Sequence, residues 1–169
     1  MAPKFATRLD WQQAELLMQP ALIRVIDNIR KNLERSPWRG DYEDVQRWPS
    51  HTPPEVQAQV IALQHELETA APERAVLIQQ TLDHLPRPYP GYELKLTQGD
   101  REARLDIWNL CYQVCFMDYE ASQLDQPAVV IDTSLINFED QEVDWQRLDD
   151  KAKQLVDAAF SHLPATDAL

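Results

Sequence analysis

The chain has 169 residues, a formal net charge of −12 and a hydrophobic fraction of 44%, which is the length and composition of one ordinary globular domain. So much negative charge repels the phosphates of nucleic acids and of anionic lipids, so we expect neither as a partner, whereas a basic protein partner is permitted. The sequence has no apolar run long enough to span a bilayer and no signal-peptide core near its start. We therefore predict a cytoplasmic protein whose cysteines are free thiols.

The N-terminal part of the chain has the pattern of a helical half. Apolar residues within positions 10–18 repeat at helical spacing, and Pro20 suits the first position of a second helix. That second helix should end near Ser36-Pro37, because a residue before proline avoids helical geometry. The pattern predicts two helices separated at the proline.

The composition of residues 36–51 indicates a loop, since two prolines and a glycine are interleaved with aromatic and charged residues. In the stretch Thr52-Pro53-Pro54-Glu55, the threonine can cap a helix, the first proline suits its first position and the glutamate completes a capping box. Pro72 begins the next helix, which ends near Leu85. These signals predict two further helices.

Alternating prolines make residues 85–91 a stiff connector that cannot continue a helix. Residues 92–98 then alternate between apolar and polar side chains, which predicts a strand. The segment 100–119 is ambiguous. It is either one buried helix or a strand over 102–108, paired in a hairpin across Gly99-Asp100, followed by a helix.

Further along, the β-branched run at 128–131 predicts another strand, and Asp144 is placed to cap a final helix. The expected fold class is therefore α+β, a mainly helical single domain with a small antiparallel sheet of two or three strands. Within it we expect a helical half at 1–85, an α+β half at 86–164 and a frayed tail at 165–169.

Two cysteines, Cys111 and Cys115, lie in the apolar stretch DIWNLCYQVCFMDY. Their four-residue spacing is not the C-x-x-C spacing of redox sites and zinc knuckles, and a zinc site would need two more ligands. A buried reduced cysteine behaves as a small hydrophobic residue. We interpret the pair as core residues and expect no metal or other cofactor, with a redox or metal-binding role as the alternative.

With only three glycines, the chain cannot contain the glycine-rich loops of dinucleotide-binding or P-loop enzymes. One alternative enzymatic or ligand-binding hypothesis remains. Asp132 follows the predicted strand at 128–131, and in open α/β sheets ligands bind beyond the carboxyl ends of strands. In this hypothesis Asp132 acts as an acid–base group together with Asp106 or His84. The alternative is that Asp132 is simply a turn residue, since aspartate is common in turns.

Aromatic and arginine side chains gather in the predicted loop and around the proline connector. Both residue types are enriched in protein–protein hot spots. The predicted partner-binding residues are Trp38, Arg39, Tyr42, Trp48, Arg87, Tyr89 and Tyr92. The alternative is that these rings fasten the loops to the core.

The segments PWRGDYEDVQRWP, LPRPYPGYELKL, DIWNLCYQVCFMDY and VVIDTSL together resemble a family of small uncharacterised proteins of cyanobacteria. The resemblance implies a cytoplasmic setting in a photosynthetic bacterium, and it implies no activity and no functional residue.

These observations favour a non-enzymatic protein-binding or assembly factor. It would act through its aromatic loops and an acidic C-terminal half, where residues 117–169 carry twelve Asp and Glu against three Lys and Arg. The acid–base or ligand-binding domain is the competing hypothesis.

Overall fold

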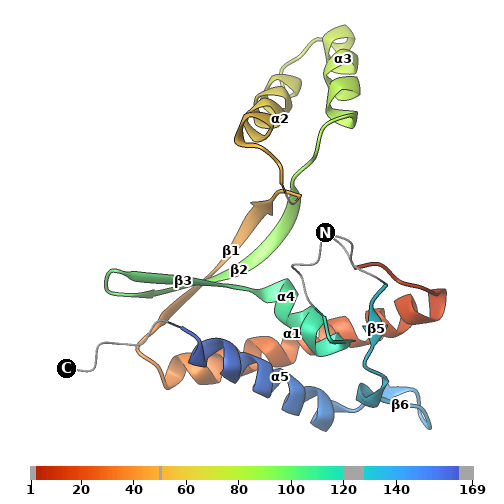
Figure 1. Ribbon diagram of the computed structural model, residues 1–169, viewed down its shortest axis with the longest axis vertical. Helices are drawn as coiled ribbons and strands as arrows, with labels where there is room; N and C mark the ends of the chain where they lie inside the picture. The colour runs from red at the N-terminus through yellow and green to blue at the C-terminus, as the bar shows by residue number, and fades with distance from the viewer. Residues whose placement is uncertain (1–2, 50, 120–127, 164–169) are drawn as a thin grey trace. The chain divides into compact units, whose positions relative to one another are not determined.

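The structure, a computed structural model, describes residues 3–49, 51–119 and 128–163 (Figure 1). Over these ranges it contains five α-helices and small antiparallel sheets of two or three strands. The predicted fold class, mainly helical α+β, is confirmed. The tail predicted at 165–169 lies outside the described residues.

The chain divides into two compact units. The smaller is Val45–Gly91, and the larger combines Ala2–Asp44 with Tyr92–Leu169. The first helix belongs to the larger unit, so the two units do not follow the division predicted at residue 85.

Helix α1 (Arg8–Glu34) is the main support of the larger unit. The predicted break at Pro20 is wrong, because α1 continues through this proline. It packs against α4 (Ile107–Cys115) and α5 (Trp145–Ser161). A proline inside a helix costs about 3 kcal/mol, whereas each large apolar side chain that is fully buried contributes about 1.5–3 kcal/mol. The buried apolar residues of α1 are Ala14, Leu17, Ala21, Val25 and Ile29.

A three-stranded sheet has the order β1 (Arg39–Arg47), β2 (Tyr89–Gln98) and β3 (Arg101–Asp106). The loop predicted at 36–51 is therefore wrong over β1, which is an edge strand. Edge strands carry charged residues that discourage further pairing, and this makes their composition resemble that of a loop. Gly40 lets β1 approach α1, since a Cβ there would lie 2.9 Å from Leu33 Cδ1.

The ambiguous segment 100–119 is a strand followed by a helix. Strands β2 and β3 form an antiparallel hairpin in which Gln98 pairs with Arg101, and Gly99 takes the positive φ of 59° that its turn requires. Asp106 then ends the strand and caps α4, because its carboxylate accepts from the backbone N–H of Asn109 at 3.1 Å.

After α4 the chain forms short strand pairs. Strand β4 (Phe116–Met117) pairs with β5 (Val130–Ile131), within the strand predicted at 128–131. A 3₁₀ turn, η1 (Thr133–Leu135), leads to β6 (Ile136–Asn137), which pairs with β7 (Glu142–Val143). The predicted cap of α5 is confirmed: the Asp144 carboxylate accepts from the backbone N–H of Arg147 at 3.1 Å.

The smaller unit is a helical hairpin of α2 (Pro54–Leu67) and α3 (Pro72–Asp83). The start of α3 at Pro72 is confirmed. The capping box predicted for α2 is wrong, because Pro53 is the N-cap and makes no side-chain hydrogen bond. The Thr52 hydroxyl donates instead to the carbonyl of Pro49 at 2.7 Å.

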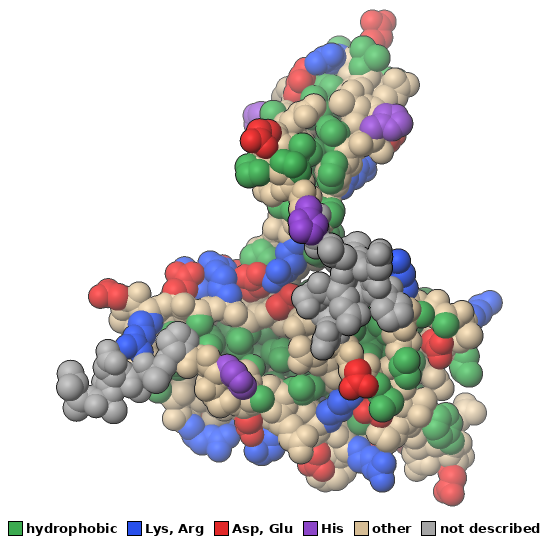
Figure 2. Space-filling model, in the orientation of Figure 1, with side chains coloured by type: hydrophobic (Ala, Val, Ile, Leu, Met, Phe, Trp, Pro, Cys, Tyr) green, Lys and Arg blue, Asp and Glu red, His purple; other side chains and the backbone are tan. Residues whose placement is uncertain are grey.

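The core of this hairpin is small, with Val60, Ile78 and Leu82 as its buried residues. Ile61, Val76 and Leu77 are more than half exposed. Figure 2 shows hydrophobic side chains on the visible surface of the hairpin.

The two cysteines lie in the core of the larger unit, fully buried. Burial raises the pKa of each thiol to about 12, with the Asp106 carboxylate adding to the effect at Cys111 and the neighbouring Cys111 at Cys115. The Sγ atom of Cys115 lies 3.6 Å from the Sδ atom of Met18. These are the surroundings of structural cysteines, since a reactive thiol needs a lowered pKa and access to solvent.

Helices α1 and α5 are joined by a polar seam, which we define as Arg24, Asn28 and Asn32 of α1 with Asp149 and Asp157 of α5. Asn28 is only 2% exposed and donates to the Arg24 carbonyl at 2.8 Å and to the Asp149 carboxylate at 3.1 Å. Arg24 also donates to Asp149 at 2.8 Å, and Asn32 donates to Asp157 at 2.8 Å. The seam fixes how the two helices align, because sliding either one would break several partly buried hydrogen bonds.

Candidate functional site

Four of the predicted partner-binding residues lie in the larger unit. Trp38 is only 8% exposed and belongs to the core, so its prediction as a surface contact is wrong, and the ring fastens the chain between α1 and β1. Arg39 is exposed at the start of β1. Tyr42 is 38% exposed and stacks on the half-buried Tyr92, with ring centroids 5.6 Å apart and planes inclined by 10°.

The other three predicted residues, Trp48, Arg87 and Tyr89, lie in the smaller unit. Trp48 is half-buried and packs against the hairpin core. Arg87 is exposed and donates to the Asp83 carboxylate at 2.6 Å, and Tyr89 is half-buried. Their role in binding stays a prediction.

Within the larger unit, Tyr42 and Tyr92 begin a longer aromatic row. It continues along α4 through Trp108 and Tyr112 and ends at Phe116, the residue that follows α4. Tyr92 lies 6.4 Å from Trp108, and Tyr112 lies 5.8 Å from Phe116 between ring centroids. Trp108 and Tyr112 are four residues apart on one helix and are therefore neighbours on its surface. The row connects the sheet to the far end of α4.

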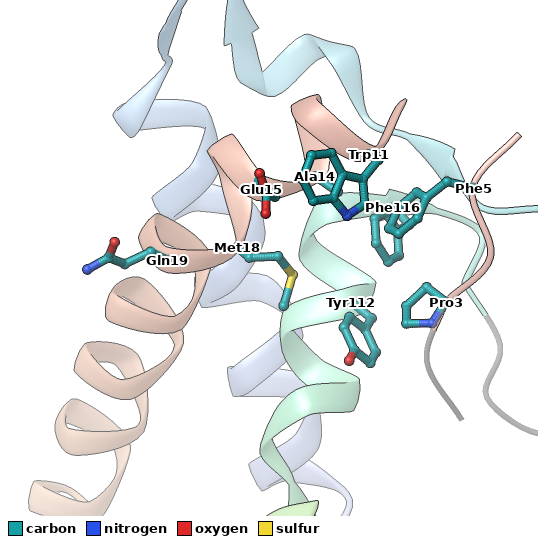
Figure 3. A pocket seen from close by; sticks show the side chains of 9 residues that line it. All are labelled: Pro3, Phe5, Trp11, Ala14, Glu15, Met18, Gln19, Tyr112 and Phe116. Carbon is teal, nitrogen blue, oxygen red and sulfur yellow. The ribbon is translucent and has the colours of Figure 1, made fainter. Parts of the chain in front are cut away.

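At that far end the row reaches an aromatic hollow of about 560 Å³. Figure 3 shows the rings of Trp11, Phe5 and Phe116 gathered together, with Tyr112 and Pro3 beyond them, while Met18 points into the space and Gln19 points away. The hollow is lined by Pro3, Phe5, Trp11, Ala14, Glu15, Met18, Gln19, Tyr112 and Phe116. Its volume is in the range of pockets that hold small molecules or partner side chains.

Three segments build the hollow. Trp11, Ala14, Glu15 and Met18 follow the i, i+3, i+4, i+7 spacing that places residues on one face of α1. Residue 112 lies near the end of α4, and residue 116 directly follows that helix. The segment before α1 is held in place because the carbonyl of its residue 4 accepts from the backbone N–H of residue 129 at 2.8 Å.

The aromatic walls are braced by ring contacts. Phe5 meets Phe116 edge to face, with centroids 6.1 Å apart and planes inclined by 73°, an arrangement favoured by the ring quadrupoles. Tyr119 packs against both Tyr112 and Phe116 at 5.5 and 5.8 Å. The hollow is therefore held by packed rings and by two helices of the core.

The electrostatics of the hollow are simple. Burial raises the pKa of Tyr112, and neighbouring Tyr119 adds to the effect, so this phenol stays neutral at physiological pH. Glu15 is the single charged side chain among the lining residues. Its carboxylate is exposed, and no described residue forms an ion pair with it. Trp11 is 44% exposed. An apolar, partly open cage thus has one carboxylate at its rim.

The alternative site at Asp132 has a different character. Asp132 follows β5, and its backbone N–H donates to the carbonyl of Cys115 at 2.9 Å. Lys151 Nζ lies 2.8 Å from Asp132 Oδ2, and the Ser134 hydroxyl donates to Oδ1 at 2.5 Å. Burial alone would raise the pKa of Asp132, but the bonds from Lys151 and Ser134 outweigh it and hold the pKa below its ordinary value.

The partners predicted for Asp132 lie elsewhere. Asp106 caps the first turn of α4, whereas Asp132 is bonded to its last residue, so the nine-residue helix separates them by about 13 Å. The two aspartates do not form one two-carboxylate site. His84 belongs to the smaller unit, where it is the C-cap of α3.

No protein-family model matches the chain, and searches of curated proteins and of solved structures give no significant match. Among the described residues, no cluster of three or more His, Cys, Asp or Glu side chains could hold a metal ion. In the same ranges, none of the helices has the length and apolar character needed to cross a membrane.

The aromatic hollow was not predicted from the sequence. One signal pointed toward it: Trp108, Tyr112 and Phe116 form a second aromatic stripe beside the buried stripe of the cysteines. The α1 wall was also visible as helical spacing. Nothing in the sequence indicated that the two stripes meet, because about a hundred residues separate them.

Proposed function

We propose that the chain is a non-enzymatic protein-binding or assembly factor, and that the aromatic hollow receives a side chain of its partner. The observation that carries this proposal is a tryptophan, Trp11, left 44% exposed at the rim of a hollow walled by further rings. Tryptophan and tyrosine anchors that fill or line pockets supply most of the binding free energy in many interfaces.

The aromatic row leads from the aromatic hollow to a second hollow near the sheet, and we propose that the partner also contacts this second hollow. Tyr42 lines this second hollow of about 480 Å³ together with Ile26, Arg30, Leu33 and Glu34. Burial raises the pKa of Tyr42 to about 12, with Tyr92 adding to the effect, so its hydroxyl remains a neutral donor. Arg39 and Tyr42 are the predicted contacts of this unit that stay accessible to a partner.

The charge of the chain favours a basic partner. A net charge of −12 favours encounter with a basic surface and slows approach to nucleic acid or anionic lipid. A cytoplasmic location and a cyanobacterial source belong to this proposal as well. In the smaller unit, Trp48, Arg87 and Tyr89 remain proposed contacts.

The acid–base alternative has less support. A general acid or base is effective when its pKa lies near the working pH, whereas the pKa of Asp132 is held below its ordinary value by Lys151. A partly buried ion pair between Asp132 and Lys151 accounts for these contacts.

A site-specific photocrosslinking experiment tests the proposal. A photoreactive residue replaces Gln19, which borders the hollow and whose side chain points outward, where it can reach a bound partner; as a control it replaces the exposed Gln154 of α5. In cells of the source organism we expect one defined protein to be crosslinked from position 19 and not from position 154. The purified pair should then bind directly.

Two tryptophan variants make the test specific. Trp11→Ala should lower the yield of the crosslink and the affinity of the purified pair at least about tenfold. Trp145→Ala removes a ring that is 51% exposed at the start of α5 and should change neither. Equal binding by both variants, or no defined product from position 19, would contradict the proposal.

A further inference from the structure

We propose that the side chain taken up by the aromatic hollow is a lysine, with its ε-ammonium over the ring faces and hydrogen-bonded to Glu15. This inference rests on the proposed function and names the chemistry of the partner at that site.

The walls favour a cation. Aromatic faces carry partial negative charge and attract an ammonium group lying within about 6 Å of the ring centroid. Four rings line this hollow, from Phe5, Trp11, Tyr112 and Phe116, and the polarizable thioether of Met18 lies among them. The same apolar surfaces can cover the methylenes of a lysine, whose stem is hydrophobic.

The charges favour a cation as well. Glu15 lines the hollow, no described residue neutralises it, and the lining residues include no lysine or arginine. Lys4 and Arg8 are exposed on neighbouring segments and are not part of the lining. A carboxylate beside apolar walls strengthens a hydrogen bond from an ammonium, since charged donors and acceptors form the stronger bonds.

The shape distinguishes lysine from arginine. A guanidinium is planar and stacks on a flat ring face, whereas an ammonium is a compact charge on a flexible stem. The planes of Phe5 and Phe116 are inclined by 73°, so these two rings do not offer parallel faces between which a planar guanidinium could stack. With about 560 Å³, the hollow has room for one lysine side chain and part of the adjoining backbone.

The binding test uses Nα-acetyl-lysine methylamide as the probe and its ε-hydroxy analogue, which lacks the charge, as the neutral control. The readout is the indole N–H signal of Trp11 in a two-dimensional NMR spectrum, assigned among the five tryptophans by its loss in Trp11→Phe. We expect this signal to shift saturably as the lysine probe is added. The affinity for the hydroxy analogue, fitted from the same shift, should be at least about threefold weaker.

A charge variant tests the role of the carboxylate. Glu15→Gln should weaken binding of the lysine probe about three- to tenfold and leave the hydroxy analogue unchanged. Glu139→Gln makes the same charge change at an exposed acid outside the hollow and should have no such effect. Unchanged positions of the other four indole signals confirm that each variant is folded.

Each other outcome overturns the inference. Equal binding of the two probes would show that the hollow takes an apolar side chain, and stronger binding of Nα-acetyl-arginine methylamide would assign it to a guanidinium. No shift of the Trp11 signal with any probe would remove the site. If Trp11→Ala abolishes binding of the protein partner while Glu15→Gln does not, the proposed function holds and the lysine assignment fails.

Discussion

Helix α1 has two surfaces of opposite character, the polar seam with α5 and the aromatic hollow at the end of α4. In the seam, Asn28 and Arg24 both bond to Asp149, and the amide of Asn28 is almost fully buried. At the hollow, Glu15 has no partner among the described residues and Trp11 is 44% exposed. The seam is an interface completed within the chain, whereas the hollow presents the features of an interface that lacks its second side.

The comparison is most sharply tested at Met18, which lines the hollow and whose sulfur lies 3.6 Å from the sulfur of the buried Cys115. Because burial raises the pKa of both thiols to about 12, we expect a thiol reagent at pH 8 to label the native protein at least about a thousandfold more slowly than the unfolded chain. Labelling followed by mass spectrometry measures both rates. Rapid labelling of Cys115 alone would show that the hollow opens into the core.

Breaking the seam should lower the free energy of unfolding. Asn28→Ala removes two hydrogen bonds at a buried position and leaves a small cavity, so we expect a loss of about 2 kcal/mol. Gln12→Ala, at an exposed position of the same helix, should stay within about 0.5 kcal/mol of the parent. Urea unfolding gives both values, and equal stability of the two variants would argue against a completed interface.

The Asp132–Lys151 pair is a second contact completed within the chain, and its contribution depends on pH. Asp132→Asn should cost about 1–2 kcal/mol at pH 7, since both side chains are partly buried. The pKa of Asp132 is lowered on folding, so its contribution is fully present above the unfolded value near 3.9 and is lost as the pH falls through the folded value.

Urea unfolding of the parent and Asp132→Asn at pH 7, 5 and 3 tests this dependence. The difference between them should be similar at pH 7 and 5 and smaller at pH 3. A difference that stays constant over this range would mean that the charge of Asp132 contributes nothing to stability.

The smallest expected effect on stability is at the hollow. Trp11→Ala should lower the free energy of unfolding by less than about 1 kcal/mol, because much of the ring is already in contact with water. Thermal unfolding of Trp11→Ala beside Trp145→Ala, also largely exposed, measures this. A loss above about 3 kcal/mol would assign Trp11 to the core of the fold and weaken its assignment to binding.

The sequence predicted those parts of the fold in which one local signal dominates. The β2–β3 hairpin follows from alternation and a glycine turn, and the α5 cap follows from Asp144. Prediction failed where tertiary packing overrode the local signal. Pro20 is a strong helix breaker by itself, but the buried face of α1 keeps the helix continuous. The edge strand β1 is too polar to resemble a strand.

The candidate site could be predicted only in parts. Each wall of the hollow is a recognisable stripe, but their meeting depends on how α1 packs against α4. Trp38 illustrates the opposite error. An aromatic residue in a polar stretch resembles an anchor for a partner, yet the ring is buried because Gly40 lets the strand that follows it lie close to α1.

Pro20 also divides α1 mechanically. Its ring nitrogen has no hydrogen, so the helical bond to the carbonyl of Leu16 is missing and bending costs least at this point. The α1 residues that line the hollow, 11–19, all precede the proline, and the α1 residues of the seam, 24–32, all follow it. Pro20 therefore lies between the half of α1 that lines the hollow and the half that is bonded to α5, and any bending of the helix costs least between these two halves.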